Sequence, residues 1–162
     1  MMIDRVARMG KKKPPIRLPA VAAVILLTLA CLPAVSNADG GTANKAEKAA
    51  VLQAAREFLD AEKTGDHARV YACFAPSSPY ARSHTYEDYL RQVKSSEDRV
   101  ASYTIMEVSY IQNNEDLKTW PSIQKIAQVE VVVVFVHIPT KKRSELNIGF
   151  IFLKEGGRWY KS

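Results

Sequence analysis

The chain has 162 residues and a formal net charge of +6, and 47% of its residues are hydrophobic. That charge alone would favour an anionic partner such as a nucleic acid. Its distribution argues against one, because residues 1–38 hold six of the Lys and Arg residues and one acidic residue, and the rest of the chain has a formal charge of +1. We therefore expect no nucleic-acid partner, and a single domain within residues 39–162.

Residues 1–38 have the order of a secretory signal peptide. A basic block precedes the apolar run 20–32, and the small residues Ser36 and Ala38 follow it, as export and cleavage by signal peptidase require. As a helix the run would measure about 20 Å, against about 30 Å for the hydrocarbon core of a bilayer. We predict cleavage after Ala38, an exported protein of the periplasm or the extracellular space, and membrane contact only during export.

A lipid anchor on Cys31, at the end of the apolar run, is an alternative to cleavage after Ala38. The residues Thr28-Leu29-Ala30 place the large aliphatic side chain one position too close to Cys31 for a lipid-attachment signal. After cleavage behind Ala38 only Cys73 remains, and one thiol makes no internal disulfide. We interpret Cys73 as a small buried residue on a helix.

Helical patterns follow a short polar linker at 39–44. Leu52, Ala55 and Leu59 recur at helical spacing and predict an amphipathic helix from about residue 46 to residue 63. Gly65 provides the left-handed position that ends this helix, and Asp66 caps a short second helix, which the segment 76–79 ends.

A third helix is predicted after Thr85, whose hydroxyl caps a first turn that contains Glu87 and Asp88. Its buried side is expected to hold an apolar group of four residues: Tyr86, Tyr89, Leu90 and Val93.

From residue 102 onward the pattern is that of strands. The expected strands are 102–111, 123–138, 146–154 and 158–161, with a polar loop at 113–121 and a tight hairpin at Gly156-Gly157. Helices followed by strands predict an α+β fold, in which the N-terminal helices cover one face of a curved antiparallel sheet over residues 45–162.

Two segments resemble one known family. Residues 58–66, Phe-Leu-Asp-Ala-Glu-Lys-Thr-Gly-Asp, look like the opening of nuclear transport factor two-like domains, and residues 150–161 are similar to their last hairpin. The resemblance implies a cone-shaped domain with a pocket between the first helix and the sheet. In that superfamily the pocket serves isomerases, dehydratases and ligand carriers, so the fold does not imply one function.

The pocket that the resemblance implies is expected to be apolar, and its predicted partner is a small apolar ligand or a protein of the cell envelope. No cofactor and no metal are predicted. The expected lining residues come from separate elements: Leu59, Tyr71, Phe74, Tyr89, Phe135 and Phe150.

A small isomerase or dehydratase is the alternative function, and no catalytic residue is predicted for it. Steroid isomerase relatives use a pocket tyrosine and carboxyl groups. Glu130 is the only carboxylate within the central apolar run, and strand alternation leaves both faces open to it, since either 131, 133 and 135 or 132, 134 and 136 point inward. An inward carboxylate or histidine in reach of a pocket tyrosine would favour the enzyme.

The remaining chemical candidates have simple structural interpretations. His67, His84 and His137 lie far apart, without the close spacing of zinc ligands. The basic segment 141–143 is expected to be a solvated loop tip between two strands.

The central strand generates a prediction of assembly. Residues 129–136 read Val-Glu-Val-Val-Val-Val-Phe-Val, so both faces are largely apolar, and helices can cover only one of them. We predict a homodimer through the outer face of the sheet at micromolar concentration. Light scattering on residues 39–162 tests it: one of the variants Val132→Lys and Val133→Lys should dissociate the dimer and the other unfold the domain. A monomeric wild type, or two unfolded variants, would contradict the dimer.

Overall fold

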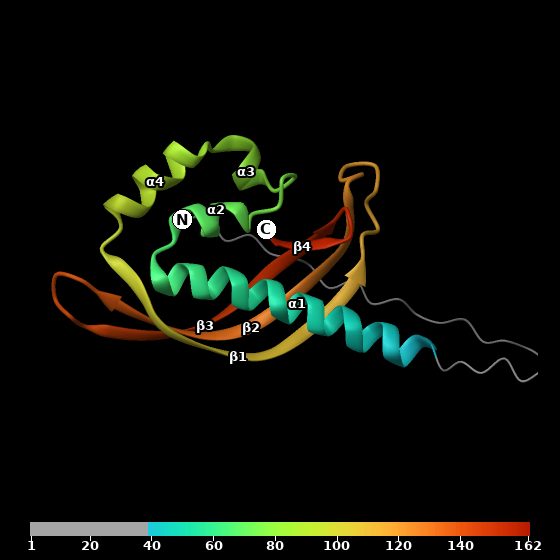
Figure 1. Cartoon of the computed structure of the whole chain (residues 1–162), viewed down its shortest axis with the longest axis horizontal. Coiled ribbons are helices and arrows are strands. Elements are labelled where there is room, and N and C mark those ends of the chain that lie inside the picture. The colour runs from blue at the N-terminus through green and yellow to red at the C-terminus, as the bar shows by residue number, and fades with distance from the viewer. Residues whose placement is uncertain (1–38) are drawn as a thin grey trace, which may run out of the picture. The chain divides into compact units, whose positions relative to one another are not determined.

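The computed structural model describes residues 39–162, which form an α+β fold (Figure 1). Four helices precede four strands in the chain, as the sequence pattern predicts. Their bounds are α1 (Asp39–Thr64), α2 (His67–Ala72), α3 (Pro79–Ser83), α4 (Tyr86–Ser95), β1 (Asp98–Asn113), β2 (Ile123–His137), β3 (Arg143–Glu155) and β4 (Arg158–Lys161).

The four strands form one antiparallel sheet in the order β1-β2-β3-β4. In Figure 1 the three long strands curve around α1, which lies on the concave side. The register of β1 against β2 shifts at three places, between Val100 and Ser102, Ile105 and Glu107, and Val108 and Tyr110. Such bulges bend a strand and increase its twist, so they help β1 to follow the curve of the sheet.

The main core lies between α1 and the concave face. Val131 and Val133 of β2 are at most 1% exposed and pack in one cluster with Val51 and Leu59 of α1. The odd-numbered positions of β2 therefore point inward, which decides between the two alternations that the sequence left open. Phe152 of β3 belongs to the same cluster.

The outer face of the sheet is less apolar than the sequence of β2 suggests. Val132 is half-buried and lies between Thr104 of β1 and Asn147 of β3 in the strand register. The next outward valine, Val134, lies between Ser102 and Glu145 in the same way. The apolar stripe is therefore one strand wide with polar borders, and the dimer stays a prediction.

Glu130 lies on this outer face, where it is half-buried. Its carboxylate accepts hydrogen bonds from Ser109 at 3.0 Å and from Gln128 at 2.5 Å. Gly149 is its partner on β3, and a Cβ at that position would lie only 2.7 Å from the Gln128 Nε2. The polar network thus depends on the missing side chain of Gly149.

The helix ends follow the predicted local chemistry. Gly65 has a φ of 70°, and the Asp66 carboxylate accepts from the Arg69 backbone N–H at 3.1 Å. Thr85 forms a capping box with Asp88 at the start of α4. Of the expected buried side of α4, only Tyr89 is fully buried, and Tyr86, Leu90 and Val93 are half-buried.

Several boundaries differ from the predictions. The expected linker at 39–44 is wrong, because α1 begins at Asp39 rather than near residue 46. The short helix α3 was not predicted; Ser78 caps it with Pro79 in its first turn. The second helix ends at Ala72, before the segment 76–79. After its end, backbone hydrogen bonds join Cys73 and Ala75 to Lys161.

The remaining predictions concern the cysteines, the signal peptide and the membrane. Cys73 is buried, as expected, at the end of α2. The predicted signal peptide and Cys31 lie outside the described residues. Between residues 39 and 162, no helix combines the length and the apolar character needed to span a membrane.

The capping box of α4 gives a test of the fold. Thr85→Ala removes an acceptor for the Asp88 backbone N–H, now 3.2 Å away, so we expect a loss of about 1 kcal/mol of unfolding free energy. The control is Ser83→Ala in α3, because that exposed hydroxyl contacts only the Pro79 and Tyr80 carbonyls of its own helix and the Nδ1 of the adjacent His84, and its removal should change little. Urea unfolding measures both, and equal effects of the two variants would contradict the capping role.

Candidate functional site

An apolar cavity of about 190 Å³ lies between α1 and the concave face of the sheet. We call it the apolar cavity. Three of its lining residues are from α1 and five from the three long strands: Phe58, Leu59, Glu62, Val100, Val133, Phe135, Ile148 and Phe150. Seven of these side chains are hydrocarbon, so the cavity suits an apolar molecule or part of one.

A second cavity of about 180 Å³ adjoins the first. We call it the polar cavity. Glu62, Val100 and Phe135 line both cavities, so the two spaces share a wall. The remaining residues of the polar cavity come from α2, α4, the turn before β1 and the start of β1: His67, Val93, Ser96, Asp98 and Arg99.

Glu62 is the carboxylate at the junction of the two cavities. It follows Ala55, Phe58 and Leu59 on the apolar side of α1 at helical spacing, so the helix carries it toward the core. Desolvation by burial raises the pKa of Glu62, and the nearby Arg99 guanidinium opposes this shift. Among the described residues nothing forms a hydrogen bond or an ion pair with this carboxylate.

The structure divides the six predicted lining residues into two groups. Leu59, Phe135 and Phe150 line the apolar cavity. Tyr71, Phe74 and Tyr89 instead form an aromatic cluster between the helices, with ring centroids 5.8 to 6.3 Å apart.

The aromatic cluster has a structural role that its contacts explain. Tyr71 donates a hydrogen bond to the His84 carbonyl at 2.7 Å, which joins α2 to the end of α3. Phe74 packs edge-on against Phe58 of α1 at 6.1 Å. These contacts hold the short helices over α1, beside the two cavities.

Tyr89 has a second property that bears on chemistry. Its hydroxyl is buried and has no hydrogen-bond partner in the described part of the chain. Burial, together with the charge of Glu62, raises the pKa of Tyr89. This hydroxyl bonds to neither Glu62 nor His67. A tyrosine–carboxylate hydrogen bond does occur in the described part of the chain, where Tyr103 donates to Asp60 at 2.6 Å, but neither residue lines the two cavities.

Sequence analysis missed Glu62, although the chain contains a signal for it. The spacing 55, 58, 59 and 62 places this carboxylate on the buried stripe of α1, where a charged residue is unusual. The carboxylate that the sequence pattern singles out instead, Glu130 in the apolar run of β2, lies on the outer face with its hydrogen bonds satisfied.

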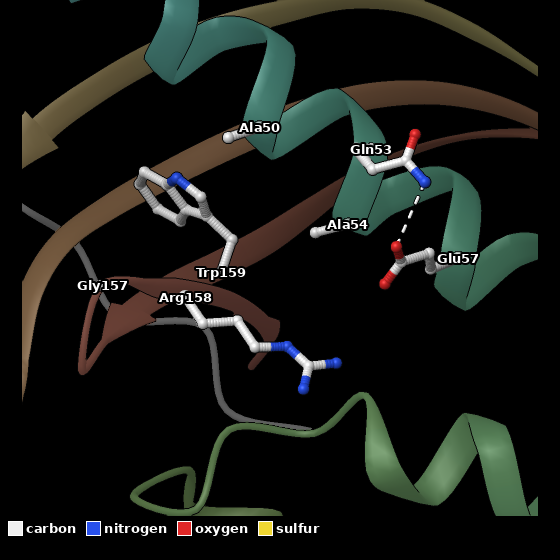
Figure 2. A pocket seen from close by; sticks show the side chains of 7 residues that line it. All are labelled: Ala50, Gln53, Ala54, Glu57, Gly157, Arg158 and Trp159. Carbon is white, nitrogen blue, oxygen red and sulfur yellow. Dashed lines mark hydrogen bonds between the residues drawn. The ribbon is translucent and has the colours of Figure 1, made fainter.

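A separate groove of about 280 Å³ lies between α1 and the β3–β4 hairpin (Figure 2). Ala50 and Ala54 of α1 face it, and the ring of Trp159 forms part of its wall. Gln53 donates to Glu57 at 3.1 Å along the helix. This internal bond and the small alanine side chains account for the groove without a ligand.

Neither a metal-binding group nor a match to known proteins gives this site a chemical identity. Within residues 39–162 there is no group of three or more His, Cys, Asp or Glu residues that could hold a metal ion. Comparison with models of known protein families and with curated proteins finds no match to this chain.

The pKa of Glu62 predicts how stability depends on pH. A carboxylate whose folded pKa is raised favours the folded state at low pH, and this contribution is lost as the pH rises through the folded value. Glu62→Gln should therefore raise the melting temperature at neutral pH, and the gain should shrink as the pH falls through the raised folded pKa and vanish near the ordinary value for glutamate. Thermal unfolding from pH 4 to pH 8 measures it. A gain that grows on acidification would contradict the desolvation of Glu62.

Proposed function

We propose that this protein is an exported binding module of the nuclear transport factor two-like type, which holds a small apolar ligand in the apolar cavity. The observation that carries the proposal is a hydrocarbon-lined space at the junction of α1 and three strands. Such junctions are common places for ligand sites, because separate elements converge there on one space.

The size of the space supports this proposal. Ligand sites in proteins commonly measure roughly 300 to 1,000 Å³. The apolar cavity alone, at about 190 Å³, is below that range, whereas together with the adjoining polar cavity it falls at the lower end. A small molecule that enters both spaces fits better than a large cofactor.

The lining residues also support entry from solvent. Phe135, Ile148 and Phe150 are half-buried, although each contributes an apolar side chain to the cavity wall. A ligand that covers these side chains would remove apolar surface from water, at about 25 cal/mol for each Å². An internal packing defect would have fully buried walls and would offer no such gain.

Filling the apolar cavity tests the function. The probe is N-phenyl-1-naphthylamine, a neutral fluorophore whose emission rises in apolar surroundings. Ile148→Phe places a ring in the cavity and should weaken probe binding about tenfold or more, equivalent to about 1.4 kcal/mol. Fluorescence titration measures the affinity of the wild type and of the variant.

The matched control is Leu146→Phe. Leu146 lies two residues earlier on β3, is 52% exposed and does not line the cavity, so the same ring added there should leave binding unchanged. Circular dichroism confirms that both variants fold. Absence of probe binding to the wild type, or equal binding by the two variants, would contradict the proposed function.

A further inference from the structure

Negatively charged side chains outnumber positively charged ones in the lining of the polar cavity. Glu62 and Asp98 are carboxylates, and Arg99 is the one cation that lines the cavity. The two carboxylates and the one guanidinium give the lining a formal net charge of −1. Charge complementarity in a partly desolvated space therefore favours a cationic group over an anionic one.

Two of the three charged groups, Arg99 and Asp98, already have partners in the protein. Arg99 Nη1 donates to the backbone carbonyls of Ser96 at 2.7 Å and Asp98 at 2.8 Å. The Asp98 carboxylate is 3.1 Å from the His137 Nδ1. Among the described residues that line the cavity, Glu62 is thus the carboxylate that forms no hydrogen bond or ion pair, although the nearby Arg99 guanidinium acts to lower its pKa.

We propose that Glu62 is a specificity-determining residue that binds the ammonium group of an amphiphilic amine, whose apolar chain occupies the apolar cavity. The inference rests on the proposed function, because it needs that cavity to hold the chain. Glu62 lines both spaces, so a ligand that occupies both of them contacts this residue. An ammonium group supplies the charge-assisted hydrogen bond that the protein does not provide.

An anionic head group fits less well in the same place. A carboxylate ligand would approach Glu62 and Asp98, and the Arg99 Nη1 already donates to two backbone carbonyls. A neutral alcohol would avoid the repulsion, but it would gain no ion pair. The order of affinity that follows is amine, then alcohol, then carboxylate, for one chain length.

Three ligands of equal length test this order. Octylamine, octanol and octanoate are titrated, below the concentration at which each forms micelles, against the purified protein with bound N-phenyl-1-naphthylamine. We expect octylamine to displace the probe at about tenfold lower concentration than octanol, as one charge-assisted bond allows. Octanoate should be the weakest competitor.

Glu62→Gln and Glu57→Gln provide the matched variants. The first removes the charge at the cavity junction and should abolish the preference for octylamine over octanol, while probe binding remains. The second neutralises a carboxylate of the same helix that lines the separate groove of Figure 2, and the preference should persist. Since Glu62→Gln removes a desolvated charge, it is expected to fold.

The dependence on pH gives a second readout. Groups that face Glu62 are His67 of α2, Tyr89 of α4, and Asp98 and Arg99 at the start of β1. Protonation of Glu62 removes its charge, so octylamine should bind less tightly as the pH falls toward the range of carboxyl groups, while octanol changes little.

The outcomes separate the two proposals. If the probe binds and Ile148→Phe blocks it, but octylamine and octanol compete equally or octanoate competes best, the amine inference is wrong and the proposed function stands. An octylamine preference that survives Glu62→Gln also overturns the role of Glu62. If the probe does not bind the wild type, the proposed function itself fails, and the inference fails with it.

Discussion

The packing of α1 against the concave face of the sheet is the contact on which the other features depend. Val51, Ala55 and Leu59 present the apolar side of this helix to Val131 and Val133 of the central strand. Each such side chain, when buried, contributes on the order of 1.5 to 3 kcal/mol. The bulges of β1 let the sheet curve around the helix, so that three strands, rather than one, contact it.

The cavities arise from the same geometry. The C-terminal half of α1 lies where β1, β2 and β3 curve past it, and the side chains there do not fill the space. The short helices α2 and α4 close part of the adjoining space and supply its polar residues. The aromatic cluster of Tyr71, Phe74 and Tyr89 fixes these helices, so residues that line neither cavity help to hold the wall of the polar cavity in place.

Glu62 is a charged residue among the hydrophobic side chains that line the apolar cavity. Its carboxylate is desolvated at a place where two cavities meet, which costs the folded protein stability at neutral pH. Natural sequences keep such groups chiefly where they serve binding or catalysis, although structural causes also occur. The unpaired state of Glu62 distinguishes it from Glu130, which is satisfied by Ser109 and Gln128.

The sequence by itself determined the elements that depend on local chemistry. Gly65, Asp66, Thr85 and the Gly156-Gly157 hairpin were read correctly, because turns and caps need particular side chains within a few residues. The α+β class followed from the change of period. The start of α1 and the short helix α3 were missed, since polar and proline-containing segments carry weak helical patterns.

The tertiary structure alone decided which faces and which residues meet. Strand period leaves the inward side of β2 open, and only the packing of α1 selected Val131 and Val133. The same packing places Leu59, Phe135 and Phe150 around a cavity. Tyr71, Phe74 and Tyr89 instead pack against one another between the helices. Solvent exposure and charge partners are properties of the folded molecule, because residues far apart in the chain supply them; only the fold could reveal Glu62 as an unpaired carboxylate.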